Sequence, residues 1–220
     1  MRRLTILSLL GLLLQIGVVS GTRAQSVGEL FVSMPDSLIP ILPDSTLRAD
    51  LLKSPGEILT NPFGGEVKVL SETEGTLRLA LDSSTELELG LLSYKKRNYI
   101  CLIATSTIVP SQSVVAFYDT EWHRMQEPLL EIPDAELFLT DRESNGVKSA
   151  LAEQGHLHWV ASFDKDNPEL LTLRITSYDD QTAHSLRPEI REKLHPVQMR
   201  WRRGRYVLYN NLDKEWIKRR

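Results

Sequence analysis

Apolar and polar residues alternate with a period of two from Glu66 onward. The alternation covers residues 66–70, 76–81 and 85–89, with Glu-Gly and Asp-Ser-Ser turns between the three stretches. This period is typical of half-buried antiparallel β-strands. Residues 97–107 contain a run, 99–104, that is apolar at every position, which predicts a central strand covered on both faces, with 113–118 as its neighbour.

The same period returns in the second half of the chain. It predicts strands at 156–163 and 170–177, joined by a turn at 164–169, and a closing hairpin of 197–202 and 205–209 around Arg203 and Gly204. Helices are expected at 145–154 and in the segment that carries Leu186, Ile190 and Leu194. The pattern predicts an α+β fold, an antiparallel β-sheet flanked by short helices. Because helices precede strands twice, two packed helix-plus-sheet halves are an alternative.

After residue 25 the pattern predicts short helices whose ends carry capping residues or proline. Ser26 and Glu29 have the spacing of a capping box, and Pro35 should end the helix that follows. Pro-Asp-Ser then occurs twice, at 35–37 and 43–45, and Asp and Ser before an apolar turn are preferred N-cap residues. We therefore interpret both copies as helix starts. The alternative is that Asp36 and Ser37 line a groove.

The first 24 residues have the pattern of a secretory signal peptide. Arg2 and Arg3 precede an uncharged run, 4–19, which is shorter than the ~20 residues of a membrane-spanning helix, and small residues follow it. We expect residues 1–24 to be a signal peptide and 25–220 to be a single α+β domain. The protein is then exported and periplasmic or extracellular. We expect that it is not a lipoprotein, because no cysteine stands directly after the cleavage site, and we expect no transmembrane segment after cleavage.

Composition narrows the classes of partner and site. The chain has 26 Lys and Arg against 29 Asp and Glu residues, and removal of residues 1–24 would remove three arginines and no acidic residue. A mildly acidic, exported protein is not expected to bind nucleic acid. Cys101 is the one cysteine and lies within an apolar strand, which predicts a buried thiol. The alternative is a nucleophile approached by His123 or His184.

His156 and His158 are candidate metal ligands, because residues two apart on a strand point the same way. Asp164, Asp166 or His184 would supply a third ligand. The alternation favours two surface histidines instead, since a metal site needs three or four convergent ligands. We expect no cofactor.

The closing hairpin is unusually basic. Trp201 and Tyr206 should face the core, while Arg200, Arg202 and Arg205 face outward around the turn at Arg203. Like charges opposite one another are unfavourable, so either the acids at 179, 180 and 189 pair with them or an anionic partner does, such as a glycan, a lipid headgroup or an acidic protein face.

Two motifs, Phe31-Val-Ser-Met-Pro-Asp-Ser-Leu-Ile-Pro-Ile-Leu42 and Phe117-Tyr-Asp-Thr-Glu-Trp122, resemble a family of uncharacterised exported proteins of the Bacteroidetes, classed as a domain of unknown function. The resemblance implies export and one α+β unit, and it implies no reaction. The basic last hairpin departs from it. We therefore expect a non-enzymatic binding or interaction module of the bacterial envelope, whose partner is an envelope protein or an anionic glycan. The alternative is a metal-dependent or other hydrolase that uses His156, His158 and nearby aspartates.

Overall fold

The computed structural model describes residues 25–139, 145–152, 157–164, 167–176 and 188–209. Its helical elements are short: α1 (Val27–Val32), η1 (Asp36–Leu38), α2 (Ser45–Lys53), η2 (Ala135–Phe138), α3 (Asn145–Ala152) and α4 (Pro188–Arg191). Its strands are β1 (Leu59–Thr60), β2 (Glu66–Glu72), β3 (Thr76–Ala80), β4 (Thr85–Tyr94), β5 (Arg97–Ser106), β6 (Gln112–Tyr118), β7 (His158–Asp164), β8 (Asn167–Thr176), β9 (Val197–Arg202) and β10 (Arg205–Leu208).

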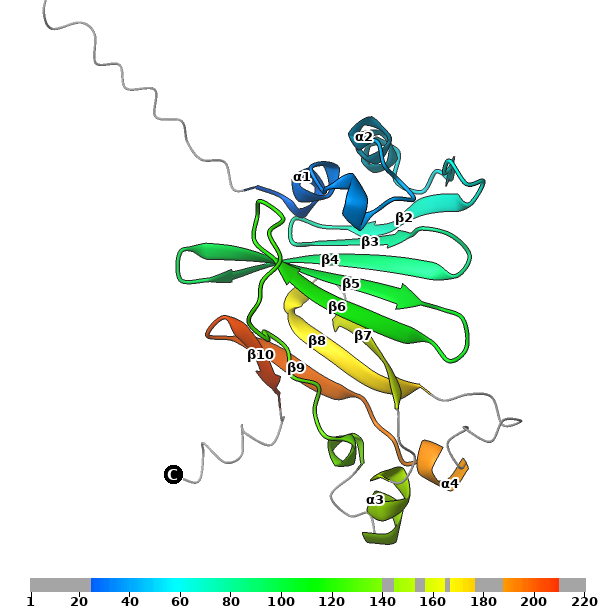
Figure 1. Cartoon of the computed structure of the whole chain (residues 1–220), viewed down its shortest axis with the longest axis vertical. Helices are drawn as coiled ribbons and strands as arrows, with labels where there is room; N and C mark the ends of the chain where they lie inside the picture. The colour runs from blue at the N-terminus through cyan, green and yellow to red at the C-terminus, as the bar shows by residue number, and fades with distance from the viewer. Residues whose placement is uncertain (1–24, 140–144, 153–156, 165–166, 177–187, 210–220) are drawn as a thin grey trace, which may run out of the picture.

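These strands form two antiparallel sheets. The large sheet has six strands in the order β1-β2-β3-β4-β5-β6, and the small sheet has four in the order β10-β9-β8-β7. Within each sheet, strands that follow one another in the chain are therefore hydrogen-bonded neighbours. The predicted antiparallel sheet is confirmed, but it is divided in two, and the helices are a minor part of the fold (Figure 1).

The large sheet is covered on both faces. On β4, Leu87 and Leu89 face a core cluster shared with α1 and α2, whereas Leu92 belongs to the cluster between the sheets. On β5, Ile100 joins the first cluster and Cys101 the second. This two-sided burial explains why 99–104 is apolar throughout, and it confirms the prediction of a central strand.

The two sheets pack closely where β4 passes the small sheet. An added Cβ at Gly90 would lie 2.6 Å from Cζ of Phe163, so only glycine allows this approach. The indole N–H of Trp201 donates to the carbonyl of Ser93 at 3.0 Å. A further small cluster, which includes Leu139, Leu151 and Ile190, lies beside α3 and α4 at the far end of the small sheet.

The helix signals near the start of the described chain are mostly confirmed. Ser26 and Glu29 form the predicted capping box of α1, and Asp44 caps α2 by accepting from the N–H of Thr46 at 2.7 Å. The interpretation of Asp36 as an N-cap is wrong. Pro35 occupies the N-cap position of η1 without a side-chain hydrogen bond, and Asp36 instead accepts from Arg48 at 3.1 Å.

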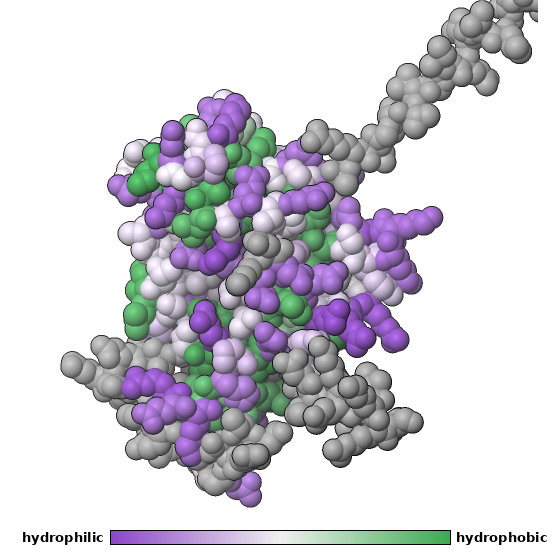
Figure 2. All heavy atoms as spheres, turned by 180° about the vertical axis from the view of Figure 1, so that it is seen from behind, coloured by the Kyte–Doolittle hydropathy of each residue, from purple (hydrophilic) through white to green (hydrophobic). Residues whose placement is uncertain are grey.

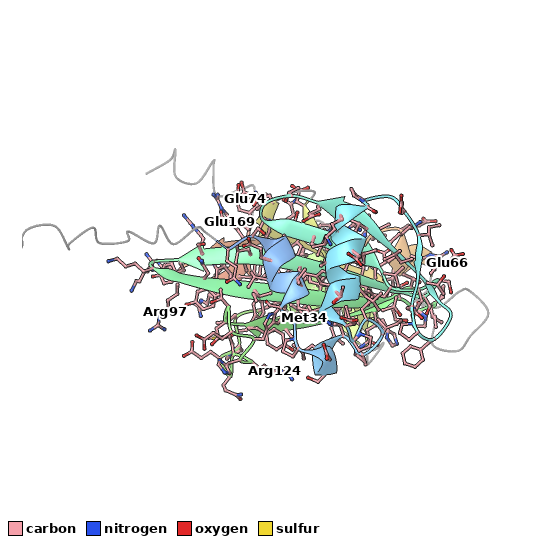
Figure 3. The ribbon with its side chains drawn as sticks, turned by 90° about the horizontal axis from the view of Figure 1, so that it is seen from above. Met34, Glu66, Glu74, Arg97, Arg124 and Glu169 are labelled. Carbon is pink, nitrogen blue, oxygen red and sulfur yellow. The ribbon has the colours of Figure 1, made fainter. Side chains whose placement is uncertain are left out.

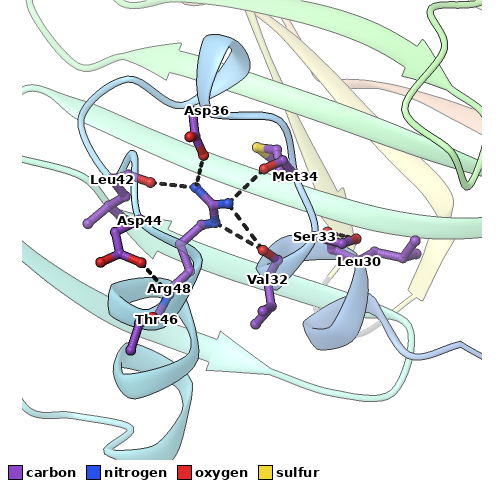
Figure 4. Close-up of polar contacts among 9 residues, drawn as sticks. All are labelled: Leu30, Val32, Ser33, Met34, Asp36, Leu42, Asp44, Thr46 and Arg48. Atoms are coloured by element: carbon purple, nitrogen blue, oxygen red, sulfur yellow. Dashed lines mark hydrogen bonds and ion pairs between the residues drawn. The ribbon is translucent and has the colours of Figure 1, made fainter.

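Arg48 joins the segments around α1 and α2. Its side chain is 3% exposed, and its guanidinium donates to the carbonyls of Val32, Met34 and Leu42 (Figure 4). Helix ends leave carbonyls without partners, and Arg48 satisfies the carbonyl of Val32 at the end of α1 together with those of Met34 and Leu42 in the segment between α1 and α2. The Pro-Asp-Ser repeat is therefore explained by local structure, through an N-cap in one copy and a partner of Arg48 in the other.

Two expectations in the second half need correction. The helix expected around Leu186, Ile190 and Leu194 is only the four residues of α4 among those that the structure describes. The turn expected at 164–169 is shorter, because β8 already begins at Asn167. In the described part of the chain, no helix combines the length and the apolar character needed to cross a membrane.

Candidate functional site: a basic surface on two hairpin turns

The β9–β10 hairpin presents its arginines to solvent, as the alternation predicts. Trp201 and Tyr206 lie opposite one another on the buried face, and Arg202 and Arg205 lie opposite one another on the exposed face. The turn between them has positive φ at both central residues, 54° at Arg203 and 82° at Gly204. This is the conformation that two-residue hairpins favour, and Gly204 adopts it without steric cost.

A second basic turn lies against this one. The β4–β5 turn carries Lys95, Lys96 and Arg97, and an added Cβ at Gly204 would lie 3.0 Å from Cδ1 of Tyr94. The hydrogen bond from Trp201 to Ser93 fixes the two hairpins side by side just below their turns. Residues more than 100 positions apart in sequence thus form one surface.

We call this the basic turn surface, and its side chains are all exposed. Its members are Lys95, Lys96, Arg97, Arg200, Arg202, Arg203 and Arg205. Seen from behind, hydrophilic side chains project from the right-hand edge, where both turns lie (Figure 2). Arg97 projects from the end of the sheet opposite to Glu66 (Figure 3). A recess of about 380 Å³ opens between the arginines of the β9–β10 hairpin and Val207.

The charges of the basic turn surface are not neutralised within the described part of the chain. None of the seven side chains forms an ion pair with a described carboxylate. Two of them lie over aromatic rings instead, Lys95 at 5.3 Å from the ring of Tyr94 and Arg200 at 5.6 Å from that of Tyr209. Glu74 and Glu169 lie at the same end of the molecule but pair with none of the seven (Figure 3).

Only half of this surface, the arginines of the last hairpin, is predictable from the sequence. The Lys-Lys-Arg run at 95–97 was a visible signal, but nothing in the sequence placed it beside the last hairpin. The alternative partners at 179 and 180 lie outside the described residues, and the side chain of Glu189 is likewise not described.

The candidate metal ligands do not converge. His158 and Asp164 are the first and last residues of β7, which places them roughly 20 Å apart along an extended strand. His156, Asp166 and His184 lie outside the described residues. Within the ranges that the structure describes, no group of three or more His, Cys, Asp or Glu side chains is placed to hold a metal ion.

Cys101 is fully buried, as predicted. Burial strongly raises the pKa of its thiol, which therefore stays protonated at neutral pH. His123 does not approach it, because its ring Nδ1 lies 3.1 Å from Oδ2 of Asp119 on an exposed turn. His184, the other histidine considered as its base, lies outside the described residues.

The share of the chain that a family profile matches shows which family the chain belongs to. The DUF3256 profile, described as a protein of unknown function, matches residues 19–206. The chain belongs to the DUF3256 family. This span contains both basic turns, so they lie within the family domain and not in an appended tail. No curated protein matches the chain.

A solved structure supports the fold of this DUF3256 chain. It is a domain of an uncharacterised protein from Porphyromonas gingivalis W83, with a TM-score of 0.68 and 21% sequence identity. The alignment covers 85% of this chain and 99% of that one. At this identity the likeness establishes the arrangement of the two sheets and says nothing of a ligand.

Proposed function

We propose that this DUF3256 protein is an exported, non-enzymatic binding module of the bacterial envelope that holds an anionic glycan on its basic turn surface. The N-terminal sequence supports export, since residues 1–24 have the charge and apolar pattern of a signal peptide. One observation carries the binding proposal. Seven exposed cations gather on two adjoining turns without a described carboxylate partner.

Like charges that face one another across a hairpin are destabilising, and Arg202 and Arg205 are direct neighbours across the strands. An anion bound between them removes this repulsion. Arginine side chains also present several N–H groups in a plane, which suits the bidentate binding of carboxylate and sulfate groups.

The chemistry around the surface favours a glycan over a membrane or a protein. Large exposed apolar residues occur elsewhere in the described chain and in neither turn: Ile58, Phe63, Leu70, Ile108, Val109, Val114, Ile132 and Leu137. Membrane-surface and protein interfaces usually combine charge with an apolar centre. A ligand that is charged and polar throughout fits this surface better.

The experiment compares binding of the 25–220 protein to four immobilised or suspended probes at low and high salt. The probes are polygalacturonate, neutral dextran, polyglutamate, and vesicles of phosphatidylglycerol with phosphatidylcholine. We expect binding to polygalacturonate that exceeds binding to the other three and weakens as salt rises, because exposed charges are screened. Equal binding to dextran would show that the charge of the glycan is not recognised, and stronger binding to polyglutamate or vesicles would replace the glycan by a protein or a membrane.

The matched variants change the same number of charges in different places. Neutralising Arg202, Arg203 and Arg205 to Gln should weaken polygalacturonate binding about tenfold, since each exposed ion pair contributes roughly 0.2–1 kcal/mol. Neutralising Lys53, Lys68 and Arg124, three exposed basic residues outside the surface, is the control. If the control loses as much as the turn variant, binding follows net charge and not this surface.

A further inference from the structure

A second recess lies where the edge of the small sheet meets the face of the large one. On β7 the N–H of Phe163 donates to Oε2 of Glu88 at 3.0 Å, and the N–H of Ala161 donates to Oγ of Ser113 at 3.0 Å. Strand β7 pairs with β8 on its other side. Its free edge therefore points at the large sheet, and the two sheets enclose a corner of about 410 Å³.

The corner is lined mainly by polar and charged side chains from both sheets. The large sheet supplies Arg78, Glu86, Glu88 and Thr105, and the small sheet supplies Val160, Ser162, Arg174 and Thr176, among others. The volume falls within the usual range of small-molecule sites. It lies at the start of β4, whereas the basic turn surface lies at its end, so roughly 25 Å of extended strand separates the two.

On the floor of this recess, Arg78 is held loosely by two glutamates. Arg78 lies opposite Glu88 in the sheet, with Nε 3.4 Å from Oε1, and its Nη2 lies 3.5 Å from Oε2 of Glu86. Glu88 is 4% exposed, and burial raises the pKa of its carboxyl. Nε of Arg78 is buried and makes no hydrogen bond. Incompletely satisfied groups of this kind are rare and concentrate at functional sites.

The facing wall offers a second cation and a free hydroxyl. Arg174 lies opposite Val160 on the exposed face of β8 and forms no ion pair with a described carboxylate. Ser162 is half-buried on the same face, and no described group hydrogen-bonds to its hydroxyl. Since both glutamates already face Arg78, the unused groups of the recess are N–H donors of two guanidinium groups and a hydroxyl.

We propose that this recess binds a small hydroxylated molecule that carries one oxyanion, of the class of uronic acids and sugar phosphates. The oxyanion lies between Arg78 and Arg174, and Ser162 hydrogen-bonds to a hydroxyl of the same molecule. Glu86 and Glu88 position Arg78 and do not contact the anion, since like charges repel. This site is separate from the basic turn surface and does not depend on the function proposed for it.

The test is a titration of the ¹⁵N-labelled 25–220 protein, followed by the backbone amide signals of β7 and β8. The probes are D-glucuronate, D-glucose 6-phosphate, inorganic phosphate and D-glucose. Each is added to about 10 mM, which is enough to detect binding as weak as a millimolar dissociation constant. We expect saturable shifts with glucuronate or glucose 6-phosphate, larger than those with phosphate or glucose. Which of the two binds more tightly distinguishes a carboxylate from a phosphate ligand.

Arg174→Gln should weaken this binding at least fivefold, and Ser162→Ala should weaken it less. Both positions are at least partly exposed, so both variants should fold. Arg97→Gln, in the basic turn surface, is the matched control and should leave the titration unchanged. The proposal is overturned if no probe shifts these signals, if phosphate or glucose binds as tightly as its sugar acid counterparts, or if Arg174→Gln binds as well as the parent.

Discussion

Replacing Arg48 should destabilise the protein more than replacing any other charged side chain around α1 and α2. Its guanidinium supplies the hydrogen-bond donors for the carbonyls of Val32, Met34 and Leu42, at 2.6 to 3.2 Å. In Arg48→Met the apolar stem is roughly preserved while these acceptors lose their partner (Figure 4). Each buried carbonyl left unsatisfied costs about 1–3 kcal/mol.

Some of this cost is recovered, because the buried charge no longer has to be desolvated and water can reach the carbonyl of Val32, which is only partly buried. We therefore expect Arg48→Met to lower the free energy of unfolding by about 3–5 kcal/mol. Asp36→Asn should cost less than about 1 kcal/mol, because that carboxylate is 64% exposed and exposed ion pairs contribute little.

Urea unfolding of the 25–220 protein, followed by tryptophan fluorescence and far-ultraviolet circular dichroism, measures these differences. Lys53→Met is the control, since the side chain of Lys53 lies on the same helix, is 72% exposed and, among the described residues, pairs with Asp50 alone. It should change the free energy of unfolding by no more than about 0.5 kcal/mol. If Arg48→Met costs no more than Asp36→Asn, the carbonyls are not what Arg48 stabilises, and the reasoning fails.

Three further predictions concern the contact between the sheets. Burial raises the pKa of Glu88 above its ordinary value of 4.5. Between pH 4.5 and this raised pKa the folded state binds more protons than the unfolded chain, so the free energy of unfolding falls as pH rises through that range. Glu88→Gln should remove this fall in pH-dependent unfolding curves, and an unchanged slope would contradict it. Gly90→Ala should cost about 1–3 kcal/mol through overpacking against Phe163, and a thermal midpoint within error of the parent would refute the close approach. Cys101 should react with a thiol reagent only at the rate of unfolding, and rapid labelling of the native protein would show that the strand is open.

Strand β3 was predictable from the sequence because one of its faces is consistently apolar. Leu77 and Leu79 on β3 alternate with polar residues, and both are buried where the pattern indicates. The polar face was harder to interpret. Glu88 occupies a polar position in the same alternation on β4, so the pattern places it in solvent, but the small sheet covers this part of β4 and buries it.

The two candidate surfaces depend on contacts between distant segments, and the period of apolar and polar residues carries no information on such contacts. The arginines of the last hairpin were found because they lie on one short stretch. Their neighbours at 95–97 were not, since the two turns are joined by the approach of Tyr94 to Gly204 and by the hydrogen bond from Trp201 to Ser93, both between distant segments. Likewise, Arg78 and Arg174 come together only because β7 docks by its edge, which depends on hydrogen bonds from main chain to side chain that no sequence pattern records.

The central claim is that two separate turns act as one anion-binding surface. The most direct test measures polygalacturonate binding of three variants at one salt concentration: Lys95, Lys96 and Arg97 changed to Gln, Arg202, Arg203 and Arg205 changed to Gln, and all six changed together. We expect each triple variant to bind about tenfold more weakly, since three exposed charges are lost in each. The variant with all six substitutions should show no measurable binding. Full binding by the variant at 95–97 would contradict the account, because the arginine hairpin would then act alone.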